Sequence, residues 1–422
     1  MKKYFLKGGI KRLLSGTILV TLALIVNAAF SYLLQLYLGR RLSIEDYGTF
    51  NALLSLFYIF SVPASVLGLS LVKISSDLVG ENKYAELTKL FWDLSKKVVI
   101  FGLFIVLFLY LFSTNLAQYF NISDPRLFAF LGLYVLGSLL VVPPQSYLRG
   151  LLMFNKFAVY AVVSGALRLT VPVAFVYLGY RVGGVYAGLF VALVLTYLFA
   201  VVQMKDKFKK VDGVQVNKFY KNILRFSLPV LLMHLGLVSL TNLDVVLVKK
   251  YLSGVDAGYY AGVVTLGKII LFGAGSVSMV MFPEISALKS AGKEYMSRFK
   301  FFVILQLGVL AAGVIVYTFL PRFITMVFFG EQFINSVQYL PLFSIFIALY
   351  VFSNFMVQFF LAIDKTIVFV FLLLPITVQF VLLSINHKNL YQVINANIVA
   401  TLILLVSLLI YLYKITKDVA PV

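Results

Sequence analysis

The chain has 422 residues, of which 62% are hydrophobic and 12% are charged, and this is more apolar surface than a soluble core of that length can bury. The formal charge of +20 would suit nucleic acid, but Lys and Arg cluster between the apolar runs, so we expect no nucleic-acid partner and assign the charge to membrane topology. The absence of cysteine excludes disulfides, thiolate catalysis and Cys-bound metals.

Apolar runs recur along the whole chain, and each is long enough to cross roughly 30 Å of hydrocarbon as a helix. The predicted fold class is therefore an all-α polytopic membrane protein with about 12 transmembrane helices. The predicted helices cover residues 15–38, 47–72, 97–115, 126–149, 158–178, 183–203, 223–248, 256–282, 300–320, 336–362, 366–385 and 391–413. The first run follows a basic segment, as in a signal peptide, but its length and the lack of an A-x-A ending indicate a retained helix.

The positive charges predict the orientation of these helices. Lys and Arg are concentrated in the connections that follow every second helix, which places both termini and residues 205–222 in the cytoplasm and residues 40–46 outside. We expect a multi-pass protein of the cell membrane, which is the inner membrane in a cell that has two. Its basic side chains are expected to lie against anionic membrane lipids, each contributing about 1 kcal/mol.

The two halves of the chain are similar in sequence. We expect a six-helix lobe at residues 1–204, a cytoplasmic linker at 205–222 and a second six-helix lobe at 223–422. A short motif repeats after the first helix of each half, with Leu42, Ser43, Asp46 and Gly48 matched by Leu252, Ser253, Asp256 and Gly258. Because each half has an even number of helices, the lobes are expected to share one orientation, with a cleft between them.

Three patches of the sequence resemble a known family. They are the run Leu38-Gly39-Arg40-Arg41-Leu42-Ser43-Ile44-Glu45-Asp46-Tyr47-Gly48, then Arg149-Gly150 with Asn155-Lys156-Phe157 and Tyr160, and finally Leu228-Pro229 with Asn242-Leu243-Asp244 and Gly258-Tyr259-Tyr260. Together they resemble the polysaccharide flippases, which are the O-antigen and capsular-repeat transporters of the multidrug/oligosaccharidyl-lipid/polysaccharide exporter superfamily. The resemblance covers essentially the whole chain.

The resemblance implies a transporter and not an enzyme. Members of this family move a polyprenyl-(pyro)phosphate-linked oligosaccharide from the cytoplasmic to the outer leaflet by alternating access, for the synthesis of cell-surface polysaccharide. No catalytic residue, cofactor or metal is expected. The expected partners are the lipid-linked oligosaccharide and, beyond it, polysaccharide polymerase or assembly proteins, with the chain itself a monomer.

Two other functions compete with this interpretation. A multidrug or small-cation exporter of the same superfamily would favour carboxylates in its cavity, whereas the charges in the middle of the predicted spans are basic and favour a phosphate-bearing substrate. A membrane glycosyl polymerase or ligase would need catalytic residues on a sizeable outer loop, and the predicted outer loops are short.

Two cations lie in the middle of predicted helices, Arg168 in 158–178 and Lys268 in 256–282. A charge at this depth costs about 2.5–3.5 kcal/mol on insertion scales, so its presence indicates a functional role. We predict that the two residues face each other across the cleft and bind the substrate's pyrophosphate, since a guanidinium can bind a phosphate bidentately and an ammonium acts as a point charge. The alternative is that each cation neutralises a carboxylate within its own half.

One acid also lies at membrane depth. Asp244 falls toward the outer end of the helix at 223–248 and matches an acidic position of the family. We predict that it binds a proton or cation coupled to transport. The alternative is an interfacial ion pair with Lys249 or Lys250.

A polar stripe follows one face of the first predicted helix. Its members recur at intervals of four residues, which keeps them on one slowly drifting face. They are Asn27, Ser31 and Gln35. Such a stripe can face the cleft and donate hydrogen bonds to sugar, or it can link neighbouring helices, and both roles stay open at this point.

Overall fold

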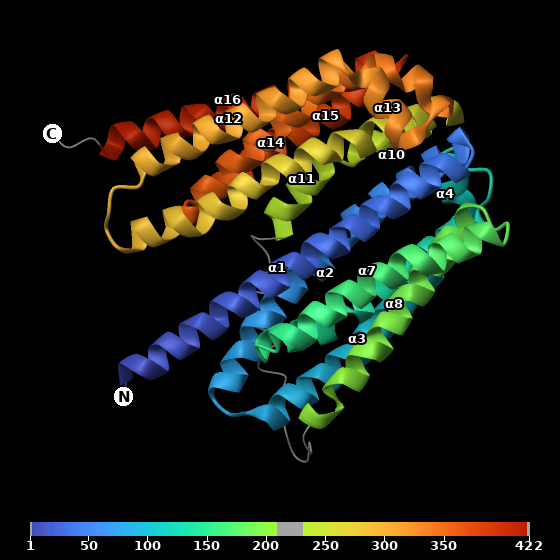
Figure 1. Ribbon diagram of the computed structural model, residues 1–422. Helices are drawn as coiled ribbons and strands as arrows, with labels where there is room; N and C mark the ends of the chain where they lie inside the picture. Colours follow the sequence, from blue (N-terminus) through green and yellow to red (C-terminus); the bar gives the residue numbers. More distant parts are fainter. Residues whose placement is uncertain (1, 209–230, 420–422) are drawn as a thin grey trace. The chain divides into compact units, whose positions relative to one another are not determined.

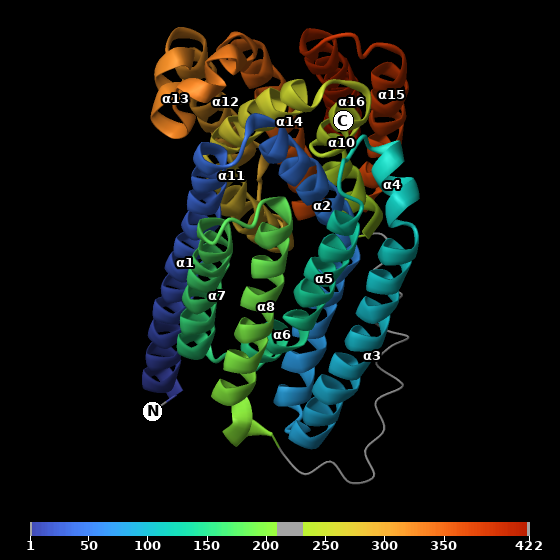
Figure 2. The same ribbon diagram turned by 90° about the vertical axis from the view of Figure 1, so that its right-hand side faces the viewer.

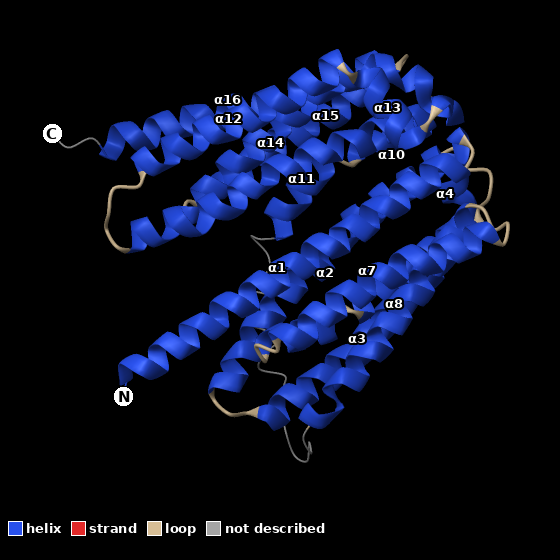
Figure 3. Cartoon of the chain, viewed as in Figure 1, coloured by secondary structure: helices blue, strands red, loops and turns tan. Residues whose placement is uncertain are grey.

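The computed structural model describes residues 2–208 and 231–419, and in these ranges the chain forms helices and no strand (Figure 3). Eleven of its helices are long and apolar enough to cross a membrane. A twelfth span results if Leu231–Leu240 and Leu243–Tyr251, which are bent by 45° at their junction, count as one. The predicted fold class, an all-α polytopic membrane protein, is confirmed.

Figure 1 traces the helices in chain order. The α-helices are α1 (Lys2–Arg41), α2 (Ile44–Gly80), α3 (Tyr84–Leu111), α4 (Ser113–Tyr119), α5 (Arg126–Leu140), α6 (Val142–Gly150), α7 (Phe154–Tyr177), α8 (Val182–Met204), α10 (Leu243–Tyr251), α11 (Gly254–Ser290), α12 (Met296–Phe319), α13 (Pro321–Phe329), α14 (Leu340–Ala362), α15 (Leu373–Ile385) and α16 (Leu390–Val419). Three 3-10 helices are η1 (Lys205–Lys207), η2 (Glu331–Tyr339) and η3 (Thr366–Leu372).

The chain groups by contact into two compact units. The first holds Met1–Leu38 and Phe60–Leu231, and the second holds Gly39–Ile59 and Leu232–Val422. Residues 39–59 are expected in the N-terminal lobe from the repeat, but they group with the second unit. As a result α1 and α2 each pass from one unit to the other without a break in the helix. Residues 209–222 of the predicted linker lie outside the described residues.

In the first unit, α3, α5, α8 and α7 pack in that order as a row of neighbours (Figure 2). Glycine allows two of these contacts to be made backbone against backbone, since a Cβ at Gly132 would lie 2.9 Å from the Cα of Val106 and one at Gly188 would lie 2.7 Å from the Cα of Pro172. Small residues at helix interfaces permit such close approach in membranes. The outer face of α3 is apolar and exposed, with Ile100 at 69%, as expected for a surface that faces lipid.

In the second unit, α14 lies against α11, α12 and α16. Aromatic rings fill the space between α12 and α14, where the ring of Phe299 stacks on Phe359 with centroids 3.6 Å apart and on Phe355 at 5.8 Å. Gly267 of α11 makes room for the ring of Phe343 on α14, because a Cβ there would overlap that ring. Large apolar side chains and small residues thus interlock in the core of this unit.

The helices extend further than the apolar runs predict. Residues 73–97 are expected to be a connection, yet α2 continues to Gly80 and α3 begins at Tyr84, with a short turn between them at Asn82, whose φ is 58°. Apolar runs mark only the part of a helix that crosses hydrocarbon. Lys, Glu and Leu, which fill this stretch, also have high helix propensity, so the helix continues past the membrane edge.

Candidate functional site

Arg168 lies on α7 of the first unit, on the same face as Ser164. Its Nη2 donates to Oδ1 of Asn27 at 2.7 Å, and its Nε lies 3.4 Å from the carbonyl oxygen of Ser164. The residue is half-buried. No carboxylate pairs with it among the described residues, so its charge is held by neutral acceptors alone.

The polar stripe of α1 has an interhelical role in this structure. Asn27 donates from Nδ2 to the carbonyl oxygen of Ala161 at 2.6 Å while its Oδ1 accepts from Arg168, so one side-chain amide links α1 to α7 twice. Ser31 donates to the carbonyl of Asn27, within its own helix, and Gln35 is half-buried. The predicted contact of these three residues with sugar stays a prediction.

Close packing positions Asn27 against α7. A Cβ at Gly165 would lie 3.0 Å from the Cα of Asn27, so the two helices touch at this level. One turn further toward the start of α7, the buried alanines Ala23, Ala158 and Ala161 continue the contact. Small residues on both helices therefore bring the amide of Asn27 within reach of Arg168.

Lys268 lies on α11 of the second unit and is half-buried. Its Nζ lies 5.2 Å from the centroid of the Tyr58 ring, a cation–π contact. It also interacts electrostatically with Asp244, which is the alternative role considered for it. Among the described residues neither a hydrogen bond nor an ion pair joins its ammonium to a carboxylate.

Asp244 is the centre of a buried polar network in the second unit. Its side chain is 1% exposed and accepts hydrogen bonds from the hydroxyl of Tyr260, from Nδ2 of Asn397 at 2.8 Å and from the backbone N–H of Val245 at 2.9 Å. These partners replace the alternative ion pair with Lys249 or Lys250. The carboxylate joins α10, α11 and α16.

The network extends to a fourth helix through Gln379 of α15. Its Nε2 donates to Oδ1 of Asn397 at 2.9 Å and to the carbonyl of Leu240 at 3.0 Å. Two buried oxygens in this region accept no hydrogen bond from the described residues, Oε1 of Gln379 and Oδ1 of Asn242. They are available to a bound cation or water.

Sequence reasoning found Asp244 and noted Tyr260 only as part of the family-like patch, and it missed Asn397 and Gln379. Asn397 and Gln379 are neutral polar residues in the last two apolar runs, and their position in those runs was the available signal. Their partner lies 153 residues away from Asn397 in the chain, so no local pattern connects them. Arg168 and Lys268 fall in different units, and their joint contact with one ligand stays a prediction.

The two copies of the repeated motif meet inside the second unit. A Cβ at Gly48 would lie 2.6 Å from the backbone nitrogen of Gly258, and one at Gly258 would overlap the carbonyl of Ile44. The hydroxyl of Tyr47, which directly precedes Gly48, lies 2.9 Å from that of Thr265, about two turns after Gly258. The glycine of each motif copy is therefore explained by backbone contact between the first turns of α2 and α11.

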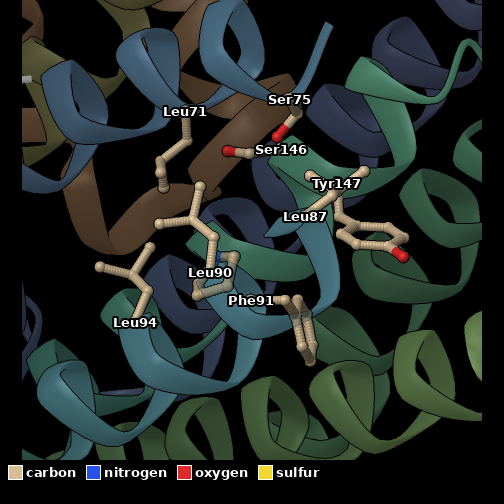
Figure 4. Close-up of a pocket in the computed structure, with 9 residues that line it drawn as sticks. Leu71, Ser75, Leu87, Leu90, Phe91, Leu94, Ser146 and Tyr147 are labelled. Atoms are coloured by element: carbon tan, nitrogen blue, oxygen red, sulfur yellow. The ribbon is translucent and has the colours of Figure 1, made fainter. Parts of the chain in front are cut away.

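A crevice in the first unit has room for a water molecule only. It lies between α2, α3 and α6 and is lined by Leu71, Leu90, Phe91 and Tyr147 among others (Figure 4). Its volume of about 10 Å³ holds about one water. The aromatic rings around it, with Phe91 and Tyr147 at 5.5 Å between centroids, serve to pack the three helices together.

Comparison with known proteins places the chain among membrane transporters in fold. The family model described as polysaccharide biosynthesis protein matches residues 13–289, and this confirms the family resemblance. No curated protein matches the chain in sequence.

Three solved structures share the fold along almost the whole chain. A multidrug resistance MATE family transporter of the MOP superfamily in its inward-facing conformation is 14% identical with a TM-score of 0.76, and covers 94% of this chain and 100% of its own. The lipid II flippase MurJ, in an inward closed conformation, is 18% identical with a TM-score of 0.73, and the match covers 94% and 87%. The outward-facing MATE structure is 14% identical with a TM-score of 0.66, covering 96% of each chain.

Proposed function

Because the chain belongs to the polysaccharide biosynthesis protein family, we propose that it is a flippase for a polyprenyl-(pyro)phosphate-linked oligosaccharide. It takes this lipid-linked sugar from the cytoplasmic to the outer leaflet by alternating access. Cell-surface polysaccharide is the end product, whether O-antigen or capsule, and polymerase or assembly proteins act on the flipped lipid. The lipid II flippase among the structures of similar fold, whose name gives a lipid-linked substrate, supports the proposal.

The observation that carries the proposal is Arg168. It is a half-buried cation within a membrane span, and its described hydrogen-bond partners are the amide of Asn27 and a backbone carbonyl. Neutral acceptors lower the cost of its charge without cancelling it. A positive charge kept in this way is suited to an anionic group that arrives with the substrate, and a diphosphate offers oxygens for bidentate binding.

Lys268 supports the same substrate class from the second unit. Its contact with the Tyr58 ring stabilises the ammonium without using its three donors. The donors remain available for a phosphate, and Asp244 acts on the ammonium only through electrostatics. A multidrug exporter would be better served by exposed acids, whereas Asp244 is enclosed by its hydrogen-bond donors.

Asp244 is proposed to couple transport to a proton or cation. The buried acceptor oxygens near it, Oε1 of Gln379 and Oδ1 of Asn242, support the cation form of this proposal, because hard cations prefer oxygen ligands. Binding of the ion would alter the hydrogen bonds of four helices in the second unit at once.

The test is flipping of a fluorescent polyprenyl-diphosphate sugar by the purified protein in liposomes. We expect Arg168→Ala and Lys268→Ala each to remove most of the flipping, since each removes a phosphate-binding charge, and Arg168→Lys to restore it only in part, because Lys lacks the bidentate fork. The rate is measured as loss of fluorescence to a quencher outside the liposomes.

Two control variants remove a positive charge elsewhere. Arg126 pairs with Asp124 at 3.0 Å, and Lys293 is exposed in the turn after α11. Arg126→Ala and Lys293→Ala are expected to flip at the wild-type rate. Normal flipping by both Arg168→Ala and Lys268→Ala would contradict the proposal, as would transport of organic cations with no flipping of the lipid.

A further inference from the structure

Arg149 is another cation of the first unit, and it donates no hydrogen bond to the residues that the structure describes. It lies in the last turn of α6, half-buried, and its guanidinium carbon lies 4.7 Å from the centroid of the Phe157 ring. No hydrogen bond or ion pair joins it to another described residue. Other cations on helices do have such partners, as Arg298 has in Glu284 at 2.8 Å and Lys97 has in Asp93 at 3.1 Å.

The backbone at Arg149 is held firmly in place. A Cβ at the next residue, Gly150, would lie 3.1 Å from the backbone carbonyl carbon of Ser75 on α2. The turn that follows is closed by hydrogen bonds from Leu152 to the carbonyl of Arg149 and from Met153 to that of Leu148. The guanidinium is therefore presented from a fixed turn, which favours a binding role over a freely solvated one.

Arg149 of α6 contacts the helix that carries Arg168, since its guanidinium lies over Phe157 of α7. Phe157, Tyr160, Ser164 and Arg168 are spaced by three or four residues and so fall on one stripe of that helix. Tyr160 is 4% exposed and interacts electrostatically with both arginines. Eleven residues separate Phe157 from Arg168, which corresponds to about 16 Å along the helix axis.

The alternative is that the charge of Arg149 only interacts favourably with the negative, C-terminal end of the dipole of α6. A cation in the last turn of a helix is favourable, by roughly 0.3–1 kcal/mol, and Lys would serve as well as Arg. That role explains a charge at this position but not a guanidinium that stacks on a ring and donates no hydrogen bond to the described residues. The spare donors are what a phosphate needs.

We propose that Arg149 is the first binding site for the lipid-borne diphosphate, at the membrane edge, and that Arg168 binds the diphosphate after it. This inference rests on the proposed function and adds a recognition step to it. Arg149 selects a lipid that carries a diphosphate before its sugar enters the span.

The test is binding of farnesyl diphosphate to the full chain in phosphatidylcholine nanodiscs, with farnesol and inorganic pyrophosphate as companion probes. We expect Arg149→Ala to weaken farnesyl diphosphate binding by about tenfold, as for the loss of a charge-assisted contact, and Arg149→Lys to restore it only in part. Farnesol should not bind measurably, and pyrophosphate should bind less tightly than farnesyl diphosphate.

Lys156→Ala is the matched control, since it removes one positive charge seven residues away whose Nζ already donates to the carbonyl of Gln203. Equal weakening by Lys156→Ala, full rescue by Arg149→Lys, or equally tight binding of pyrophosphate would each overturn the inference. Normal binding by Arg149→Ala with loss of flipping in Arg168→Ala would overturn it and leave the proposed function intact. Failure of the wild-type chain to bind any diphosphate would count against both. A thermal unfolding midpoint equal to wild type shows that the variant is folded.

Discussion

Single residues in this protein link helices and also either carry a charge or bind a charged side chain. Asn27 satisfies Arg168 while it links α1 to α7, and Asp244 accepts hydrogen bonds contributed by two other helices. A substitution at such a residue changes stability and transport together. An experiment on it therefore needs a partner variant that separates the two effects.

Asp244→Asn is expected to remove the dependence of flipping on an ion gradient and to lower stability by about 1–3 kcal/mol. The stability loss follows because the new amide N–H₂ faces the donors of Tyr260 and Asn397, so buried groups lose their partner. Both quantities are measured on the same preparation, by gradient-driven flipping in liposomes and by thermal unfolding.

Tyr260→Phe separates the two effects, since it removes one hydrogen bond to the carboxylate and leaves the charge. It should lower stability in the same direction while flipping still responds to the gradient. If Asp244→Asn keeps the gradient dependence of the wild type, Asp244 has a structural role only.

The charged candidates could be predicted from sequence because a Lys, Arg or Asp within an apolar run is conspicuous and costly. Their partners could not. Asn27 and Arg168 are 141 residues apart and Asp244 and Asn397 are 153 apart, so the pairing depends on how helices pack, which a linear pattern does not contain. Arg149 belongs to a patch that resembles the family. That it donates no hydrogen bond to the described residues can be known only from the structure.

At the scale of elements, the predicted apolar runs correspond to the observed spans in the described residues, while helix ends differ, and residues 223–230 of the predicted helix 223–248 lie outside the described residues. The sequence pattern reports contact with lipid, and a helix such as α11 (37 residues) continues well beyond that contact. The sequence repeat also could not predict that residues 39–59 group with the second unit. Sequence similarity shows that the two halves are related, but it does not show against which half the turn at residues 39–46 packs.

Gly258→Ala is expected to destabilise the protein by about 1–3 kcal/mol, because the added Cβ overlaps the carbonyl of Ile44 and the first turns of α2 and α11 must separate. Gly273→Ala in the same helix is the control, since nothing lies within 4 Å of its Cβ position and helix propensity then favours Ala. Thermal unfolding followed by intrinsic fluorescence measures both. Equal midpoints for the two variants would show that the contact at Gly258 contributes nothing.

For the whole molecule, the distribution of Lys and Arg predicts the orientation in the membrane. The chain has no cysteine, so single cysteines can report on it. Lys207→Cys and Ser43→Cys are both at exposed positions. With an impermeant thiol reagent on intact cells we expect labelling of Ser43→Cys, and labelling of Lys207→Cys only after the cells are opened. Labelling of Lys207→Cys in intact cells would contradict the predicted orientation.

The passage of α1 and α2 from one unit to the other has a mechanical consequence. No loop separates the units at Leu38 or Ile59, so any displacement of one unit must be absorbed as elastic deformation of two continuous helices. Both crossings are locally weakened, since Gly39 has low helix propensity and Pro63 has no N–H to donate to the carbonyl of Ile59. The two crossings are therefore the places at which α1 and α2 bend most easily.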